Sequence, residues 1–266
     1  MDKRIYGMLP MTIIGITIVL MTSCVGGRSD VEEGNEADTT DVDLMGLEEL
    51  DLFAEETIPK SADELFDDFL YSYVSNSEFR RQRTAYGVRQ FIMDDEMPLV
   101  VIYDREEDLQ LQKDTSVVRV VMEQIEWTEN TIHRYEFNRK DDMWMLTSMT
   151  DDDIMDTPNA SFLVFLRDFM TDSLYRNESL RLPLTMNYYS EEDEGMVEME
   201  LTYDEWTELF ADLPDMTQQL INIDYGQPQF SENRKSLQLQ GLSNGLFLTF
   251  HFDFTDSHWC LIAIES

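Results

Sequence analysis

The sequence contains few of the residues that bind metals or form disulfides. It has three His and two Cys in 266 residues, too few for a zinc finger, an iron–sulfur site or a disulfide scaffold. Basic residues are also scarce, with 19 Lys and Arg against 55 Asp and Glu and a formal net charge of −36. A general nucleic-acid binder needs a basic face to contact phosphates, so this balance excludes nucleic acid as a partner.

Long hydrophobic runs are missing as well. The apolar run Met11–Met21 is eleven residues long, whereas a membrane-spanning helix needs about 20. The chain is nevertheless 42% hydrophobic and 11% aromatic, which is typical of a folded protein and not of a disordered acidic one. Its length suffices for one large domain or for two of about 100–150 residues each.

Residues 1–23 are predicted to be an export signal. Lys3 and Arg4 form a positive start, the apolar run follows, and the chain turns polar after Cys24. Leu20–Cys24 resembles a bacterial lipobox, in which small residues precede a Cys that is diacylated and becomes the mature N-terminus. Met21 stands where Leu is usual. The resemblance implies that Cys24 is lipid-modified; the alternative is a plain secretory signal with an incidental Cys.

The lipobox resemblance also implies a location and an anchor. It indicates a Gram-negative envelope lipoprotein, attached to the membrane through its N-terminal lipid, because two or more acyl chains hold a protein stably in a bilayer. Val25 follows the Cys where Asp would often signal inner-membrane retention, which favours the outer membrane, facing the periplasm or the cell surface. Residues 24–60 carry twelve acidic residues against two basic ones, which predicts a disordered, extended acidic tether.

Beyond residue 60 the sequence repeats itself, which predicts two domains, 61–156 and 157–266. Ser61 and Glu64 form a capping box at a helix start. The apolar stripe that follows recurs one hundred residues later, with Asp68-Phe69 repeated as Asp168-Phe169. At the same offset, Tyr203-Asp204 repeats Tyr103-Asp104 and opens a helix with the capping box Thr202/Glu205.

Each half ends in a pattern typical of paired strands. The motif aromatic-x-Phe-x6-Trp-x-Leu occurs at residues 135–146 and again, 115 residues later, at 250–261. Large aromatic side chains alternating along two paired strands bury one face of a sheet against a layer of helices. The order of helices followed by strands predicts the α+β class for both halves.

Lipobox, acidic tether and two tandem α+β units together resemble a family of uncharacterised two-domain bacterial lipoproteins with nuclear transport factor 2-like (cystatin-like) folds. The resemblance covers residues 61–266. It implies two cone-shaped units, in each of which N-terminal helices pack on a bent antiparallel sheet. It implies no established activity.

Some relatives with this fold are isomerases, dehydratases or hydrolases, and such enzymes need a buried carboxylate or His inside the cone. Residues of suitable type lie along the predicted strands and loops, but no spacing ties them together: Tyr86, Tyr188, Tyr189, Tyr225, Glu123, Glu126, Glu136 and Asp253. The sequence therefore predicts no catalytic residue, and most of these side chains are expected on the wet face of a strand.

His133, His251 and His258 form no metal site or triad by their spacing. Pairing of the last two strands across Asp256-Ser257 would place His251 opposite Ile262. Cys260 lies in an apolar strand and is expected to be a buried core thiol with an ordinary or raised pKa. The acidic clusters at 94–96, 151–156 and 191–194 lack the spacing of a calcium loop and are expected to be solvated loops. No metal and no cofactor are predicted.

One basic cluster stands out in this acidic chain. Arg80, Arg81, Arg83 and Arg89 lie within ten positions, and the first three are weak candidates for a site that binds an anionic glycan or an acidic loop of a partner. The alternative is that they pair with carboxylates of the chain itself.

Taken together, the sequence predicts a membrane-anchored, non-catalytic envelope lipoprotein that binds a small molecule, a glycan or a partner protein. Two alternatives remain open. The first is an enzyme with an active-site pocket inside one cone domain, which would place a carboxylate or His with a strongly shifted pKa deep in that pocket. The second is a structural subunit of an envelope complex.

Overall fold

The computed structural model describes residues 65–93, 97–191, 193–228, 233–242 and 245–266. The expected export signal, the tether, Cys24, the Ser61/Glu64 capping box and the acidic cluster at 94–96 lie outside these residues. In the described part of the chain, no helix is long and apolar enough to cross a membrane.

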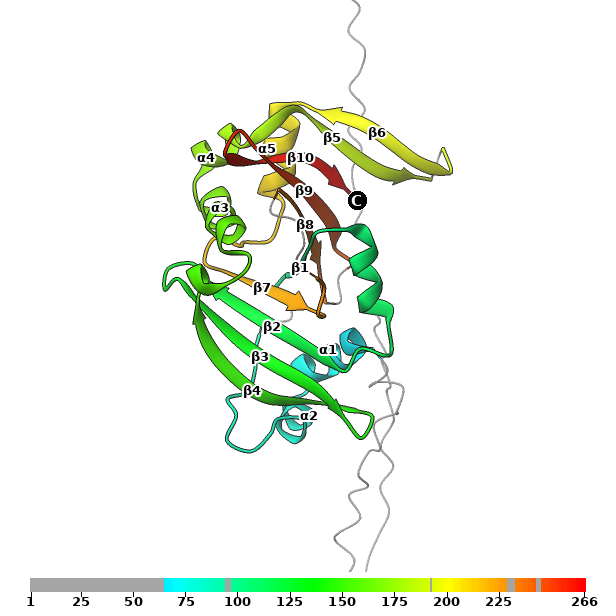
Figure 1. Ribbon diagram of the computed structural model, residues 1–266. Helices are drawn as coiled ribbons and strands as arrows, with labels where there is room; N and C mark the ends of the chain where they lie inside the picture. Colours follow the sequence, from blue (N-terminus) through cyan, green and yellow to red (C-terminus); the bar gives the residue numbers. More distant parts are fainter. Residues whose placement is uncertain (1–64, 94–96, 192, 229–232, 243–244) are drawn as a thin grey trace, which may run out of the picture. The chain divides into compact units, whose positions relative to one another are not determined.

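The described residues form short helices and the strands of one large sheet (Figure 1). The first half contains α1 (Phe66–Ser75), α2 (Ser77–Gln82), β1 (Leu99–Tyr103), the 3₁₀ helix η2 (Glu106–Lys113), β2 (Arg119–Glu126), β3 (Thr131–Lys140) and β4 (Met143–Asp153). The second half contains the 3₁₀ helix η3 (Ile154–Asp156), α3 (Ala160–Thr171), α4 (Ser173–Glu178), β5 (Leu180–Ser190), β6 (Gly195–Leu201), α5 (Tyr203–Ala211), β7 (Gln219–Asp224), β8 (Arg234–Gln240), β9 (Phe247–Thr255) and β10 (His258–Glu265).

Local sequence explains where the helices begin and end. Asn76 ends α1 and caps α2, its side-chain oxygen accepting hydrogen bonds from Glu78 N at 3.0 Å and Phe79 N at 3.1 Å. Asp172 ends α3 and caps α4 in the same way. Such caps satisfy backbone donors that a helix leaves free at its start. The predicted Thr202/Glu205 capping box is present at the start of α5.

The strands of the two halves are interleaved in one sheet. In the described residues the strand order is β4-β3-β2-β7-β1-β8-β9-β10-β5-β6. Thus β7 of the second half pairs with β2 of the first, and β1 of the first half pairs with β8 of the second. The α+β class, with helices packed on a large sheet, is confirmed. The sheet does not divide at the expected domain boundary between residues 156 and 157.

The central pair β1–β7 is parallel and is covered on both faces. Leu99, Val101 and Tyr103 of β1 belong to the core beneath α1 and α2, whereas Val100 and Ile102 belong to the core beneath α3. Alternate residues of a strand point to opposite faces of the sheet. The helices of the two halves therefore pack on opposite faces, and each half supplies one strand to the other's core.

The ring contacts define how the two halves correspond. Phe66 lies 5.3 Å from Phe137 and 5.2 Å from Trp144, measured between ring centroids. In the second half, Phe162 lies 5.4 Å from Phe252 and 5.1 Å from Trp259. The matching caps Asn76 and Asp172 give the same helix offset of 96 residues.

The offset of one hundred residues inferred for these helices is therefore wrong by four positions. A shift of four residues is close to one helical turn of 3.6, so it preserves an apolar stripe and leaves the error invisible in the sequence. The offset of 115 for the last two strands matches the structure, because both tryptophans occupy equivalent places.

Two further expectations need correction. A register shift between Leu261 and Ala263 places His251 opposite Ala263, not Ile262; a β-bulge inserts one residue that turn spacing alone does not reveal. In addition, Asp151, Asp152 and Asp153 are not a solvated loop. They form the end of β4 and interact with His133, Arg134 and Asn130 of β3 and its turn.

Candidate functional site

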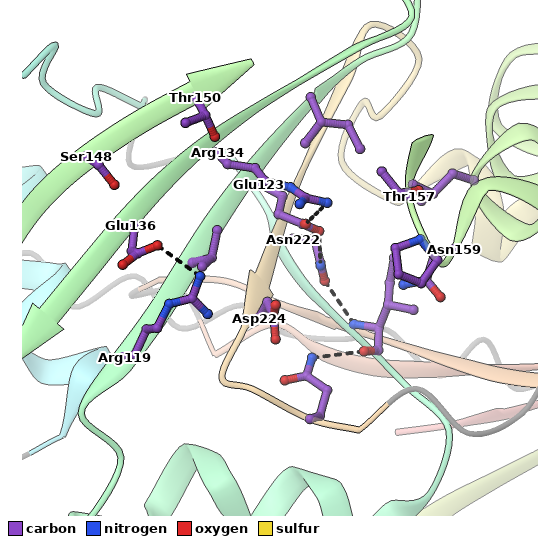
Figure 2. A pocket seen from close by; sticks show the side chains of 16 residues that line it. Arg119, Glu123, Arg134, Glu136, Ser148, Thr150, Thr157, Asn159, Asn222 and Asp224 are labelled. Atoms are coloured by element: carbon purple, nitrogen blue, oxygen red, sulfur yellow. Dashed lines mark hydrogen bonds and ion pairs between the residues drawn. The ribbon is translucent and has the colours of Figure 1, made fainter. Parts of the chain in front are cut away.

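A polar cavity of about 260 Å³ lies against β2, β3, β4 and β7, next to the start of α3 (Figure 2). Arg119, Val121 and Glu123 of β2 line it, whereas the alternate residues Val120 and Met122 point into the core beneath α1. The cavity is thus on the face of these strands that α1 and α2 do not cover. Its polar and charged lining is Arg119, Glu123, Arg134, Glu136, Ser148, Thr150, Thr157, Asn159, Asn222, Asp224 and Gln227.

Glu123 is the most buried acid of this lining, with 9% of its surface exposed. Asn222 Nδ2 donates to Glu123 Oε2 at 2.8 Å, and Arg134 Nη2 lies 3.1 Å from Glu123 Oε1. Burial raises the pKa of Glu123 above its usual value, against the opposing effects of Asn222 and Arg134. Both carboxylate oxygens have partners within the protein, so this side chain is firmly oriented.

Asn222 of β7 is itself held by the neighbouring strand β1, which comes from the other half of the chain. Its Oδ1 accepts from Ile102 N at 3.0 Å, so a residue of β1 orients a side chain of β7 that in turn holds Glu123. Gln227 Nε2 donates to the carbonyl oxygen of the same residue, Ile102, at 2.9 Å. Figure 2 shows these bonds as a connected row. This row of hydrogen bonds therefore depends on strands from both halves of the chain.

The two arginines of the cavity are engaged by carboxylates. Arg119 Nη2 lies 2.9 Å from Glu136 Oε2, and Arg134 Nη1 lies 3.2 Å from Asp152 Oδ2 in addition to its contact with Glu123. The hydrogen bond from Arg119 lowers the pKa of Glu136. These pairs place positive and negative charges side by side along the wall.

Two buried polar atoms of the lining have no hydrogen-bond partner in the described structure: the Nε donor of Arg134 and the Oδ1 acceptor of Asn159. Buried polar atoms in folded proteins are nearly always hydrogen-bonded, because an unpaired one costs about 1–3 kcal/mol. A molecule in the cavity that supplies both an acceptor and a donor would satisfy both atoms.

The structure unites some of the acids singled out by type and separates the rest. Glu123 and Glu136 share the cavity, whereas Glu126 bonds Gln124 and Asp253 pairs with Arg234. Tyr225 is buried under α1, where its hydroxyl donates to Asp67; burial raises the pKa of Tyr225 well above its usual value. Of the other tyrosines, Tyr188 is half-buried, and two are exposed: Tyr86 and Tyr189.

Sequence reasoning missed the partners that make this a site, namely Arg119, Arg134, Asn159, Asn222 and Asp224. Strand register brings together those on β2, β3 and β7, and the packing of α3 adds Asn159. The only available signal was the period-two alternation of polar residues along 119–123 and 134–136, which marks a face but does not assign it a partner.

The arginine cluster has internal partners. Arg80 Nη1 donates to Val74 O at 2.9 Å, Arg81 pairs with Glu78 at 2.6 Å, and Arg83 is buried over the Phe79 ring with its Nη1 3.4 Å from Trp144 O. The counterpart of Arg80 is Arg176, whose Nη1 donates to Phe169 O and Met170 O. Arg81 thus pairs with a carboxylate of the chain, as the alternative interpretation predicts, whereas Arg80 and Arg83 donate to backbone oxygens.

None of the three histidines lines the cavity. His133 Nδ1 lies 2.6 Å from Asp151 Oδ1, and His251 Nδ1 lies 2.9 Å from Ser236 Oγ. Cys260 is buried, and burial raises the pKa of its thiol. No group of three His, Cys, Asp or Glu side chains suited to a metal ion is found in the described ranges.

A second cavity, of about 230 Å³, lies between the ends of α3 and α5 and the segment before β7. It is mostly apolar and is lined by Met170, Phe210, Ala211, Leu213, Pro214, Asp215, Met216 and Thr217. It lacks the convergent polar side chains that fix a ligand's orientation. The polar cavity at Glu123 is therefore the better candidate site.

Comparison with known proteins supports the fold and assigns no activity. No curated protein matches the chain in sequence. The crystal structure of an NTF2-like protein from Bacteroides fragilis NCTC 9343, determined at 2.15 Å resolution, is similar with a TM-score of 0.67 and 30% sequence identity. The similarity covers 77% of this chain and 96% of the other. Residues 47–99 and 88–266 match the family described as "Domain of unknown function (DUF4348)", and the chain belongs to that family.

Proposed function

We propose that this protein is a membrane-anchored envelope lipoprotein whose folded part binds a small polar molecule in the cavity at Glu123. The observation that carries the binding proposal is the pair of unpartnered buried atoms, Arg134 Nε and Asn159 Oδ1, in the wall of one cavity. The anchoring proposal rests on the sequence around Cys24, with the acidic residues up to 60 as the tether.

The size and lining of the cavity limit what it can hold. Cavities that bind drug-sized ligands measure about 300–1,000 Å³, and this one measures about 260 Å³. That volume suits a molecule of the size of an amino acid or a monosaccharide. Apolar side chains of Val121, Ile132 and Leu163 supply contact area, and the polar groups supply orientation.

The binding proposal can be tested by isothermal titration calorimetry of the full chain in detergent against small sugars, amino sugars, amino acids and their amides. Replacement of Ser148, a half-buried residue of β4 in the cavity wall, by Phe should fill the cavity and abolish any binding that the wild-type chain shows. The matched control is Met143→Phe on the same strand, where the side chain is exposed outside the cavity. Equal binding by wild type and Ser148→Phe would place the ligand elsewhere and contradict the proposal.

One observation favours an enzyme as a second candidate: a buried carboxyl group with a raised pKa lies inside a cavity, as an acid–base residue would. We rank it second because Asn222 and Arg134 occupy both oxygens of Glu123, whereas a general base must reach the proton it removes. If Glu123 were catalytic, Glu123→Gln would abolish turnover of a bound compound and leave its affinity nearly unchanged. Loss of affinity without any turnover by the wild type would support a binding protein.

A further inference from the structure

The charges in the wall of the cavity do not cancel. Three carboxylates line it, those of Glu123, Glu136 and Asp224, against the two guanidinium groups of Arg119 and Arg134. A fourth carboxylate, Asp152, pairs with Arg134 from the next strand. Since each arginine already has a carboxylate partner, the excess in this site is negative.

Asp224 holds the unbalanced charge. Within the described residues it has no ion-pair partner, and its Oδ1 accepts a hydrogen bond from Gly226 N at 2.8 Å. Its charge contributes to the raised pKa values of both Arg119 and Glu123, so it lies close to both side chains. In Figure 2 its side chain lies between Arg119 and the Glu123–Asn222 pair.

The hydrogen-bonding groups left free point to the same kind of ligand. Asn159 Oδ1 requires a donor, Arg134 Nε requires an acceptor, and a carboxylate such as Asp224 only accepts. An anionic ligand would find an acceptor's place at Arg134 Nε but would also face the like charges of Glu123, Glu136 and Asp224. A neutral ligand would leave Asp224 uncompensated.

We propose, on the basis of the binding function proposed above, that the ligand is a small primary amine that also carries a hydroxyl or carbonyl oxygen. The ammonium group neutralises Asp224, a further N–H or O–H donates to Asn159, and the oxygen accepts from Arg134 Nε. An amino sugar and an α-amino amide both have this chemistry, and the cavity volume admits either.

The test compares matched compounds that differ in the amine alone, titrated against the full chain at pH 7: glucosamine against glucose, and glycinamide against glycolamide. We expect the amine of at least one pair to bind about tenfold more tightly than its hydroxyl counterpart, as one partly buried ion pair provides. Binding by glucosamine alone would identify the amino-sugar form, and binding by glycinamide alone the amino-amide form.

Two variants locate the charge that causes the preference. Asp224→Asn keeps an oxygen for the Gly226 N–H but removes the charge, so it should reduce the preference for the amine to less than about twofold. Glu198→Gln, on an exposed position of β6, removes one charge from the strongly acidic chain and should leave the preference intact. A preference that survives in Asp224→Asn, or one lost equally in Glu198→Gln, overturns the assignment.

The remaining outcomes separate this inference from the proposed function. If glucose or glycolamide binds as tightly as its amine and loses that binding in Ser148→Phe, the cavity is a binding site and the amine assignment is wrong. If none of the four compounds, and no anion such as gluconate, binds at millimolar concentration, both proposals fail together.

Discussion

The two halves of the protein have equivalent sheet faces, one of which is open and charged and the other covered by a neighbouring segment. The offset of 115 residues aligns Arg119, Glu123, Arg134 and Glu136 with Arg234, Gln238, Thr249 and His251. In the first half this face forms the open, charged cavity. In the second half η2 contacts it, with Gln112 Nε2 donating to Gln238 Oε1 at 2.8 Å, and Ser236, Gln238 and Thr249 are buried.

This contrast shows how a duplicated fold can carry one site. The covered face carries uncharged Gln238 and Thr249 where the open face carries Glu123 and Arg134, as expected where charges would otherwise be buried under a packed segment. Tyr103 occupies the place that corresponds to Asp224, and burial raises the pKa of Tyr103 to about 12, so it is neutral. The open face carries the charged side chains, and this is where we place the ligand.

The largest expected effect tests whether the two halves are energetically one unit. Trp144→Ala and Trp259→Ala each remove a buried ring from an equivalent place and should each cost about 3–5 kcal/mol of unfolding free energy. Because the strands are interleaved, both variants should unfold in one transition, measured by urea titration with fluorescence and circular dichroism. Two separate transitions would show that the halves unfold independently and would contradict the prediction of one cooperative unit.

The next effect contrasts an ion pair of the covered half with one of the cavity. Lys235 Nζ lies 2.6 Å from Asp104 Oδ1, and both side chains are almost fully buried. Lys235→Met leaves a buried carboxylate behind and should cost about 3 kcal/mol. Arg119→Met breaks the more exposed pair with Glu136 and should cost less than about 1 kcal/mol. If urea titrations show similar losses of unfolding free energy for the two variants, the covered face and the open face do not differ in how strongly they depend on their ion pairs.

A smaller effect is expected at the strand junction beneath the cavity. Asn222→Leu deprives Ile102 N of its acceptor and Glu123 of its donor, which should cost about 1–3 kcal/mol and abolish ligand binding. The corresponding residue of the covered half is the buried apolar Val101. An apolar side chain is therefore compatible with this place in the sheet, and Asn222→Leu should still fold. The control is Asn187→Leu on β5, where the side chain is outside the cavity. Retained affinity in Asn222→Leu, measured by calorimetry, would show that Glu123 needs no orientation.

The pH dependence of stability should distinguish Glu123 from its counterpart Gln238. Burial raises the pKa of Glu123 above its ordinary 4.5, so the folded state holds this proton more tightly than the unfolded state. The wild type therefore loses stability as the pH rises from the ordinary value through the raised one, and the loss is complete above the raised value.

Glu123→Gln removes that titration and reproduces the residue of the covered half. The difference in unfolding free energy between the variant and the wild type should rise with pH across that window and be constant at higher pH. A difference that falls with pH would mean that Arg134 and Asn222 lower the pKa of Glu123 below its ordinary value.

The smallest effect concerns the arginine cluster. Arg81 pairs on the surface with Glu78 one helical turn away, and Arg81→Ala should leave ligand binding and the unfolding transition unchanged within error. A loss of binding in calorimetry would identify this cluster as the ligand site and contradict the placement of the ligand in the cavity at Glu123.

Particular residues show how far the sequence could predict this protein. The strands around Tyr135, Phe137 and Trp144, with their repeat 115 residues later, were predictable because large aromatic side chains must be buried on one face. The helix correspondence was not, because a slip of four residues preserves the apolar stripe. Glu123 and Glu136 were noted by type, but Asn222, which donates to Glu123, and Asp224, which shares the cavity, lie about a hundred residues away, and no local pattern connects them.

The sequence by itself determined the helix caps, the amphipathic stripes, the strands and the acidity of the chain, since each of these depends on residues close together in the chain or on composition. Tertiary structure alone decided that β1 and β7 change places, which face of the first half stays open, and which polar side chains meet there. Those outcomes depend on pairings between residues far apart in the chain, where the buried area and hydrogen bonds of the whole sheet select one arrangement among many with similar local patterns.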